Sequence, residues 1–205
     1  MESSSLFPMF LKLTRRRCLV VGAGGIGFAK VQSLLASGAV VRVVAPEASK
    51  QLEALARAGK ILWEKRWFAP ADLAGTLLAV VATDSAETNR QIYREAQGRG
   101  VLCNVVDDPE HCDFYYPAVV RRGALQIAIS TGGLSPALAQ RLRLELEAQF
   151  GAEFETWLNH LGAIRRNLFT ADMQPEERHR RLHRLASRAG WQDYVQQRRT
   201  SNDER

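Results

Sequence analysis

The stretch Val20-Val21-Gly22-Ala23-Gly24-Gly25-Ile26-Gly27 ends an apolar run and opens a helical pattern. Its glycines fit the spacing G-x-G-x-x-G at Gly22, Gly24 and Gly27, which is typical of a dinucleotide-binding turn between a strand and a helix. The first glycine permits a tight turn, the second leaves room for a pyrophosphate, and the third lets the helix pack closely on the strand. The alternative is a tight turn that binds nothing.

The helix that follows this turn should present its N-terminus to the phosphates. A helix N-terminus offers unpaired N–H groups and the positive end of the helix dipole. Here those groups would belong to Gly25 and Ile26.

Residues 17 to 106 alternate between short apolar runs and helical patterns. The runs are rich in Val, Leu and Ile at nearly every position, as strands buried on both faces are. This alternation predicts an α/β fold with a parallel sheet covered by helices. The expected strands are Cys18–Gly22, Val40–Ala45, Lys60–Trp63, Leu77–Ala82 and Val101–Val106, and the expected helices include Gly27–Ala36, Ser49–Ala58 and Ala86–Gln97.

The pattern changes near residue 113. Two further strands are expected, followed by a helix that Ser135-Pro136 opens, because serine is a good N-cap and proline suits the first helical position. From Glu153 onward the chain predicts helices that end in a frayed polar tail. The expected elements are strands Val119–Arg121 and Leu125–Ser130, helices Ala137–Phe150, Glu153–Phe169, Pro175–Arg188 and Trp191–Gln197, and the tail Arg198–Arg205.

Composition narrows the class of protein. With 46% hydrophobic and 24% charged residues among 205, the chain predicts a globular protein. It lacks an apolar run of roughly 20 residues for a membrane helix and the features of a signal peptide, so we expect a cytoplasmic protein without a membrane partner. Three cysteines fit no zinc template, and we expect Cys18 and Cys103 in the core. The net charge of +6 does not identify a partner, and without a recognisable motif we expect no nucleic acid.

Three polar positions follow the expected strands. Glu47 lies 20 residues past Gly27, where an acidic residue meets the ribose hydroxyls of NAD, although it could instead lie in the first turn of the next helix. NADP remains an alternative cofactor, because Arg42 and Lys50 are cations that could bind its extra phosphate. Thr83-Asp84 ends the fourth strand, so these residues either contact the cofactor or cap the next helix through Asp84.

Asp107 is the first charged residue beyond the fifth strand. Ligands bind beyond the carboxyl ends of such strands, and a carboxylate can take the proton that accompanies removal of a hydride. The alternative is a turn, because Asp107-Asp108-Pro109 is good turn chemistry. His111, Cys112 and Asp113 follow closely, but adjacent ligands on one loop are rarely well aimed, so we predict no metal site.

Several stretches resemble precorrin-2 dehydrogenases and the corresponding part of siroheme synthases. The match covers residues 6 to about 150 and rests on Phe7–Leu11, Val44–Glu47, Asn104–Pro109, Cys112–Ala118 and Leu125–Ala139. The resemblance implies NAD-dependent oxidation of precorrin-2 to sirohydrochlorin, in some members followed by insertion of ferrous iron. It also implies a homodimer with a Rossmann domain at 1–113, a dimerisation segment at 114–150 and a helical domain at 151–205. Asp107 then corresponds to the catalytic residue, and Gly25, Ile26, Pro46 and Glu47 to cofactor-binding positions.

The tetrapyrrole that this family oxidises carries eight carboxylates, which suits a basic cleft. Arginine pairs well with carboxylates because its planar fork can bind both oxygens. Ser130-Thr131-Gly132-Gly133 precedes a helix and could cradle a carboxylate, or it could be a structural loop at the dimer interface. The basic candidates are Arg121, Arg122, Arg141, Arg143 and residues 178–184.

One departure from the family is Ala29, which stands where members often carry arginine. It removes one positive charge near the site. A functional alternative is a Rossmann module that senses a nucleotide without catalysis, because a fold does not fix a function. In that case Asp107 would be dispensable.

Overall fold

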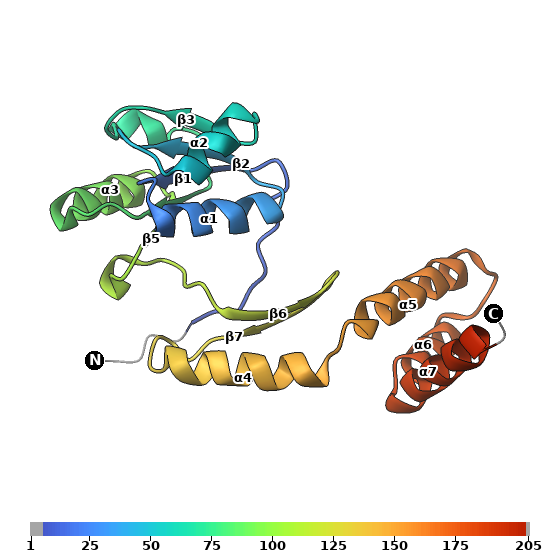
Figure 1. Cartoon of the computed structure of the whole chain (residues 1–205). Helices are drawn as coiled ribbons and strands as arrows, with labels where there is room; N and C mark the ends of the chain where they lie inside the picture. The colour runs from blue at the N-terminus through green and yellow to red at the C-terminus, as the bar shows by residue number, and fades with distance from the viewer. Residues whose placement is uncertain (1–5, 204–205) are drawn as a thin grey trace. The chain divides into compact units, whose positions relative to one another are not determined.

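The computed structural model describes residues 6–203 and divides into two compact units, Met1–Tyr116 and Pro117–Arg205 (Figure 1). The first unit contains a parallel sheet with the strand order β3-β2-β1-β4-β5, which confirms the predicted fold. Most bounds lie within two residues of expectation, as is usual for element ends. The elements are β1 Arg17–Val21, α1 Gly25–Ala36, β2 Val40–Val44, α2 Lys50–Arg57, β3 Leu62–Glu64, the 3-10 turn η1 Pro70–Leu73, β4 Leu78–Val81, α3 Ala86–Gly98, β5 Leu102–Val105 and the 3-10 turn η2 Pro109–His111.

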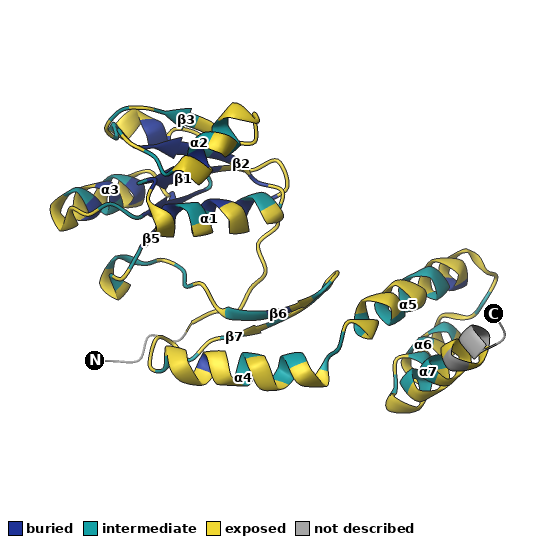
Figure 2. Ribbon diagram, viewed as in Figure 1, coloured by how far each residue is buried: buried dark blue, intermediate teal, exposed yellow. Residues whose placement is uncertain are grey.

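The sheet is buried on both faces except at its edge strand β3, which is teal in Figure 2 where the inner strands are dark blue. In β1, Cys18 and Val20 belong to the cluster that includes residues of α1 and α2. Leu19 and Val21 belong to the other cluster, which includes residues of α3. Because each strand serves two cores, nearly every position in it is apolar.

The third strand is shorter than predicted, because Lys60 is not part of it. The N–H of Lys60 donates to the carbonyl of Leu55 at 3.0 Å, so this residue closes the C-terminal end of α2. Ile61 is buried, and pairing with β2 begins at Leu62. The apolar run therefore contains a helix end as well as a strand.

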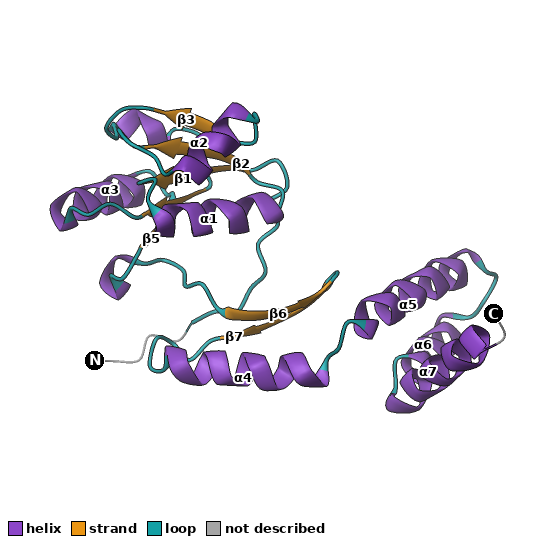
Figure 3. Ribbon diagram, viewed as in Figure 1, coloured by secondary structure: helices purple, strands orange, loops and turns teal. Residues whose placement is uncertain are grey.

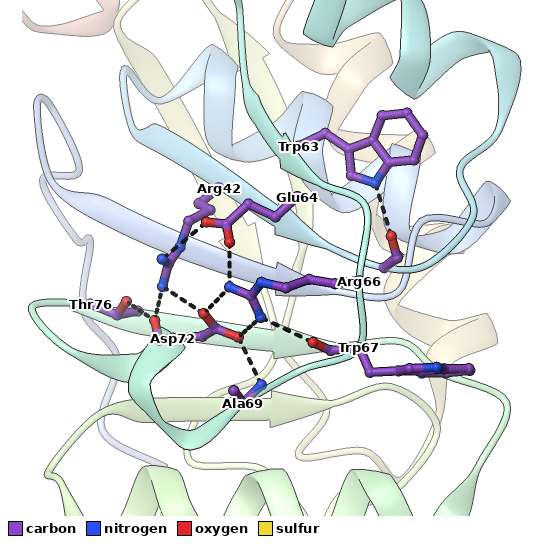
Figure 4. A network of polar contacts seen from close by, with 9 residues as sticks. Arg42, Trp63, Glu64, Arg66, Trp67, Ala69, Asp72 and Thr76 are labelled. Atoms are coloured by element: carbon purple, nitrogen blue, oxygen red, sulfur yellow. Dashed lines mark hydrogen bonds and ion pairs between the residues drawn. The ribbon is translucent and has the colours of Figure 1, made fainter.

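β2 and β3 are neighbouring strands, drawn in orange in Figure 3, and η1 is the short turn that leads from β3 to β4. A polar network joins both strands to η1 (Figure 4). At its centre is Asp72, which is 2% exposed. Its carboxylate accepts hydrogen bonds from Arg66 at 2.6 and 2.8 Å and from the N–H of Ala69 at 2.9 Å. Arg42 donates to the Asp72 carbonyl and to Glu64 at 3.3 Å. The network therefore holds three segments together with almost no exposure of its central charge.

Replacing Asp72 with asparagine should lower the free energy of unfolding by about 2 kcal/mol, less than for a fully buried pair because the arginines are partly exposed. Hydrogen bonds from Arg66 lower the pKa of Asp72 although burial opposes this. The carboxylate therefore contributes its full stabilisation at pH values above its ordinary pKa of about 4. This contribution is lost as the pH falls through the lower pKa that Asp72 has in the folded protein. Urea unfolding should show a large difference in the free energy of unfolding between wild type and Asp72→Asn at pH 7, and a smaller difference in strong acid. Asp172→Asn, at an exposed position, is the control, and equal midpoints for Asp72→Asn and wild type at pH 7 would contradict the assignment.

The second unit begins with an antiparallel hairpin and continues as helices. Gly123 has a φ of +56° at the hairpin turn, a conformation that favours glycine. Arg122 satisfies carbonyls at the end of the first helix of this unit, donating to Phe150 O at 2.7 Å and Glu147 O at 3.0 Å. The elements are β6 Ala118–Arg122, β7 Leu125–Ile129, α4 Pro136–Gln149, α5 Glu153–Thr170, α6 Pro175–Leu185 and α7 Arg188–Asp203.

The prediction of a frayed tail was wrong for the described residues after 197, because α7 runs to Asp203. Arg198 donates to the Thr156 hydroxyl of α5 at 3.0 Å, so the tail is held by another helix. The break between α6 and α7 also lies earlier than expected, since the hydroxyl of Ser187 accepts from the N–H of Gly190 at 3.2 Å. Residues 204–205 lie outside the described chain. Across residues 6–203, no helix has both the length and the apolar character of a membrane span.

Candidate functional site

The predicted cofactor positions and Asp107 lie at one edge of the sheet of the first unit. All five strands are parallel, so the loops that follow them emerge at the same edge (Figure 1). The strand order reverses between β1 and β4, which is where such sheets bind ligands. The residues that the fold brings to this edge are Gly22, Gly24, Gly25, Ile26 and Gly27 after β1, Pro46 and Glu47 after β2, Thr83 and Asp84 after β4, and Asp107 after β5.

The glycines of the turn fall into two groups. Gly22 has a φ of +97°, and a Cβ there would collide with the carbonyl of Ala82, whereas one at Gly27 would collide with the carbonyl of Gly22. Packing within the protein therefore requires these two glycines. At Gly24 and Gly25, a Cβ would have no atom within 4 Å. The space beside them is open, and packing within the protein does not explain why they are glycines.

The N-terminus of α1 is suited to an anion. Gly24 is its N-cap, no side chain caps it, and its first turn contains no acidic residue. The N–H groups of Gly25 and Ile26 have no acceptor among residues 6–203. Unpaired N–H groups beside open space fit the pyrophosphate of a dinucleotide.

Glu47 lies in the loop between β2 and α2, not in the first turn of α2. That helix begins at Lys50, and the Ser49 hydroxyl caps it by accepting from the N–H of Leu52 at 3.4 Å, so the first-turn alternative was wrong. The N–H of Ser49 donates to the Ala23 carbonyl at 2.9 Å. This bond fixes the exposed Glu47 loop beside the glycine turn.

From the sequence alone, Arg42 was a candidate to bind the extra phosphate of NADP, but in the structure it is paired with other residues. It pairs with Glu64 and Asp72 in the network described above. Lys50 stays exposed. The structure therefore removes one of the two cations that could have met a ribose phosphate.

Thr83 and Asp84 differ in their surroundings. The Thr83 hydroxyl bonds to Asn89 Oδ1 at 2.5 Å, and Asn89 Nδ2 donates to the Thr83 carbonyl at 3.1 Å. Ser85 caps α3 by accepting from the N–H of Thr88 at 3.2 Å, so the prediction of a cap by Asp84 was wrong. Asp84 is exposed and remains a candidate for contact with a ligand.

Asp107 adopts a left-handed backbone conformation with a φ of +60°. Aspartate tolerates this region better than most residues, at a cost of about 1 kcal/mol, and such residues cluster at functional sites. The neighbouring backbone is well fixed, because the N–H of Val106 donates to the Val81 carbonyl at 2.9 Å. The N–H of Asp108 donates to the Val105 carbonyl at 3.3 Å, so Val106 and Asp107 form a turn, as the alternative reading of the sequence predicted, and this turn carries an exposed carboxylate.

A pocket of about 160 Å³ adjoins Asp107 and contains a residue that the sequence analysis missed. Lys30 of α1 lines it, with the ammonium 3.6 Å from the centroid of the Tyr116 ring. Burial lowers the pKa of Lys30, and the charge of Asp107 opposes this effect. The spacing of Lys30, one turn after Gly27, was the available signal. The lining residues are Lys30, Asn104, Val105, Val106, Asp107, Asp108, Pro109, Cys112, Tyr115 and Tyr116.

The polar residues that follow Asp107 hold their own loop in place. Asp108 Oδ2 and His111 Nδ1 are 2.8 Å apart, and the Asp113 carboxylate accepts from the N–H of Cys103 at 2.8 Å. Asn104 donates to the Phe114 carbonyl at 2.8 Å. Within residues 6–203, no group of three His, Cys, Asp or Glu side chains could hold a metal ion.

The predicted substrate residues Arg121 and 130–133 belong to the second unit. Arg121 is exposed, and its side chain has no partner among residues 6–203. The Ser130 hydroxyl accepts from the N–H of Gly132 at 3.2 Å, and the Thr131 hydroxyl accepts from the N–H of Ser135 at 3.1 Å. Both hydroxyls therefore support the turn that precedes α4.

The other basic candidates on β6 and α4 are paired with groups of this unit. Arg122 caps α4, Arg141 pairs with Glu145 at 3.2 Å, and Arg143 pairs with Glu147. In α6, the guanidinium of Arg178 lies 4.6 Å from the ring centroid of Phe169. Arg121 is thus the least constrained of the basic residues proposed on β6 and α4.

Comparisons with known proteins show the family and the fold. A family described as putative NAD(P)-binding matches residues 9–118, and one described as sirohaem biosynthesis protein central matches residues 122–149. Siroheme synthases of Chromobacterium violaceum and Methylobacillus flagellatus are 44% and 45% identical, each over 72% of this chain and 34% of the relative. The chain thus spans about a third of these relatives. The solved structure of SirC, precorrin-2 dehydrogenase, superposes with a TM-score of 0.77 at 24% identity, covering 94% of this chain and 98% of that one, which shows the fold.

Proposed function

We propose, from the premise that this chain belongs to the putative NAD(P)-binding family matched over residues 9–118, that it oxidises precorrin-2 to sirohydrochlorin with NAD. One observation carries the proposal. The exposed carboxylate of Asp107 lies at the same sheet edge as a helix N-terminus whose N–H groups face open space. The similarity to siroheme synthases and the likeness to a precorrin-2 dehydrogenase support this choice of substrate.

In this proposal, some residues of the site bind the cofactor and Asp107 takes part in the reaction. Gly25 and Ile26 bind the pyrophosphate through their N–H groups, and Glu47 binds the adenosine ribose. NAD supplies, when bound, the acceptor for a hydride from the substrate. Asp107 takes the accompanying proton, so the substrate loses two hydrogens as one hydride and one proton. A nucleotide sensor is not favoured, because it would not need the carboxylate.

Anaerobic incubation with precorrin-2 and NAD tests this function. The absorbance of NADH and of sirohydrochlorin should rise together, in equal amounts. Adding ferrous ion afterwards tests for insertion of iron into the product, the second activity that the family resemblance implies. A protein that binds NAD but forms no NADH from precorrin-2 would instead be a nucleotide sensor.

Replacing Glu47 with glutamine should weaken binding of NAD about threefold to tenfold. It should also reduce the ratio by which the protein binds NAD more tightly than NADP. A hydrogen bond to a charged group contributes about 1.5 kcal/mol, and a carboxylate there repels the extra phosphate of NADP. Calorimetric titration of both nucleotides measures the ratio of their dissociation constants. Glu53→Gln, on the adjacent helix, is the control, and an unchanged ratio in Glu47→Gln would remove this residue from the cofactor site.

We also infer a homodimer formed through the segment 114–150. Leu134 is 89% exposed, and Leu138 and Leu144 are exposed on α4. Several large exposed apolar side chains in one segment favour contact with another chain. Sedimentation should give the mass of two chains, and Leu134→Asp should lower the stability of the dimer.

A further inference from the structure

Lys30 is a half-buried cation that forms no ion pair among residues 6–203, although the charge of Asp107 acts on it. Its ammonium lies 3.6 Å from the ring centroid of Tyr116, and it takes part in no ion pair or hydrogen bond with residues 6–203. An ammonium has three donors and no acceptor, and a charge withdrawn from water without a partner is costly. The aromatic ring compensates for part of this cost, and the donors remain available.

The residues that line the pocket around this ammonium include more anions than cations. Of the ten residues that line the pocket, Lys30 is the one cation, whereas Asp107 and Asp108 are anions. Asp108 is already 2.8 Å from His111, whereas Asp107 forms no ion pair with the described residues and acts on Lys30 only through its charge. A ligand that carries carboxylates would be repelled by Asp107 unless a cation compensated nearby.

We propose that Lys30 binds one carboxylate of the macrocycle and thereby positions the ring for reaction beside Asp107. The identity of the ligand rests on the function proposed above, and the role of Lys30 is additional to it. Lys30 and Asp107 line the same pocket, so the peripheral carboxylate meets Lys30 while the ring carbon and its proton meet Asp107. Lys30 is therefore a positioning residue for the substrate and not an acid or a base.

The contact with Tyr116 adds direction to this binding. The ring covers one side of the ammonium, so a carboxylate approaches from another side. Desolvation of its hydroxyl raises the pKa of Tyr116 to about 12, although the residue as a whole is 37% exposed, so it stays neutral. The ring and the pocket wall together hold the long lysine side chain in place before the substrate binds, which lowers the entropy cost of binding.

Steady-state oxidation of precorrin-2 by Lys30→Met and Lys30→Arg tests the proposal. Methionine keeps the length of the side chain without the charge and should raise KM roughly tenfold, the size of one lost charge-assisted hydrogen bond, with a smaller change in kcat. Arginine keeps the charge and should restore KM to within about threefold. The dissociation constant of NAD should be unchanged in both, and the exposed Lys60→Met is the matched control.

A second measurement does not depend on turnover. Uroporphyrin, a macrocycle with eight carboxylates, should bind Lys30→Met more weakly than wild type by a similar factor, and the difference should shrink at high salt. A merely structural lysine would lower the thermal midpoint without this dependence on salt. Wild-type KM and wild-type affinity for uroporphyrin in Lys30→Met would overturn the proposal. Failure of the wild-type protein to oxidise precorrin-2 would refute instead the function on which it rests.

Discussion

Replacing Asp107 with asparagine should reduce precorrin-2 oxidation at least a hundredfold and leave NAD binding within twofold of wild type. Loss of a positioned general base typically costs a factor of about 10² to 10⁴ in rate. Asparagine suits the left-handed backbone conformation of Asp107 as well as aspartate does, so the substitution removes the charge and keeps the geometry. Measuring kcat, KM and the dissociation constant of NAD separates the loss of chemistry from the loss of binding.

The adjacent carboxylate provides the control for this experiment. Asp108 lines the same pocket, but it is held against His111, so Asp108→Asn should keep activity within about tenfold of wild type, an effect on the loop and not on proton transfer. Wild-type turnover by Asp107→Asn would exclude Asp107 as the base. Equal losses in both variants would point to a disturbed loop.

Replacing Gly24 with alanine should weaken NAD binding about a hundredfold while leaving the unfolding midpoint unchanged. The Cβ meets no atom of the protein within 4 Å, and the φ of −75° suits any residue, so the fold should accept it. The methyl group would instead keep the pyrophosphate away from the N–H groups of α1. Two charge-assisted hydrogen bonds of about 1.5 kcal/mol each then weaken, which corresponds to about a hundredfold.

Two other glycines separate binding from folding in the same assay. Gly98→Ala also places a Cβ in open space, but far along the chain in α3, and should leave NAD binding unchanged while raising stability by up to about 1 kcal/mol. Gly22→Ala combines a φ of +97° with a collision against the Ala82 carbonyl and should destabilise the protein. Unchanged affinity for NAD in Gly24→Ala would mean that the open space beside this turn is not the cofactor site.

Local patterns in the sequence were enough to predict the sheet. The strands are apolar at nearly every position because Leu19 and Val20 point into different cores, and this signal lies within a few residues. The same holds for Ser135-Pro136, which caps α4 as expected. The error at Lys60 arose because a helix end and a strand start share one apolar run.

Features that depend on distant residues could not be predicted. The network around Asp72 joins residues up to 30 positions apart, and no short motif marks it. The role of Lys30 could not be predicted because it depends on contact with Tyr116, which is distant in sequence and lies against α1 only in the folded protein. The same reason explains the tail, because Arg198 is held by Thr156 of another helix. Tertiary contacts, which local patterns do not encode, decided each of these cases.

A crystal structure of the protein with bound NAD examines most directly whether cofactor and base share one site. The account predicts phosphate oxygens within hydrogen-bonding distance of the N–H groups of Gly25 and Ile26, and the nicotinamide ring at the pocket that Asp107 and Lys30 line. A dinucleotide bound elsewhere, or a nicotinamide directed away from Asp107, would contradict it.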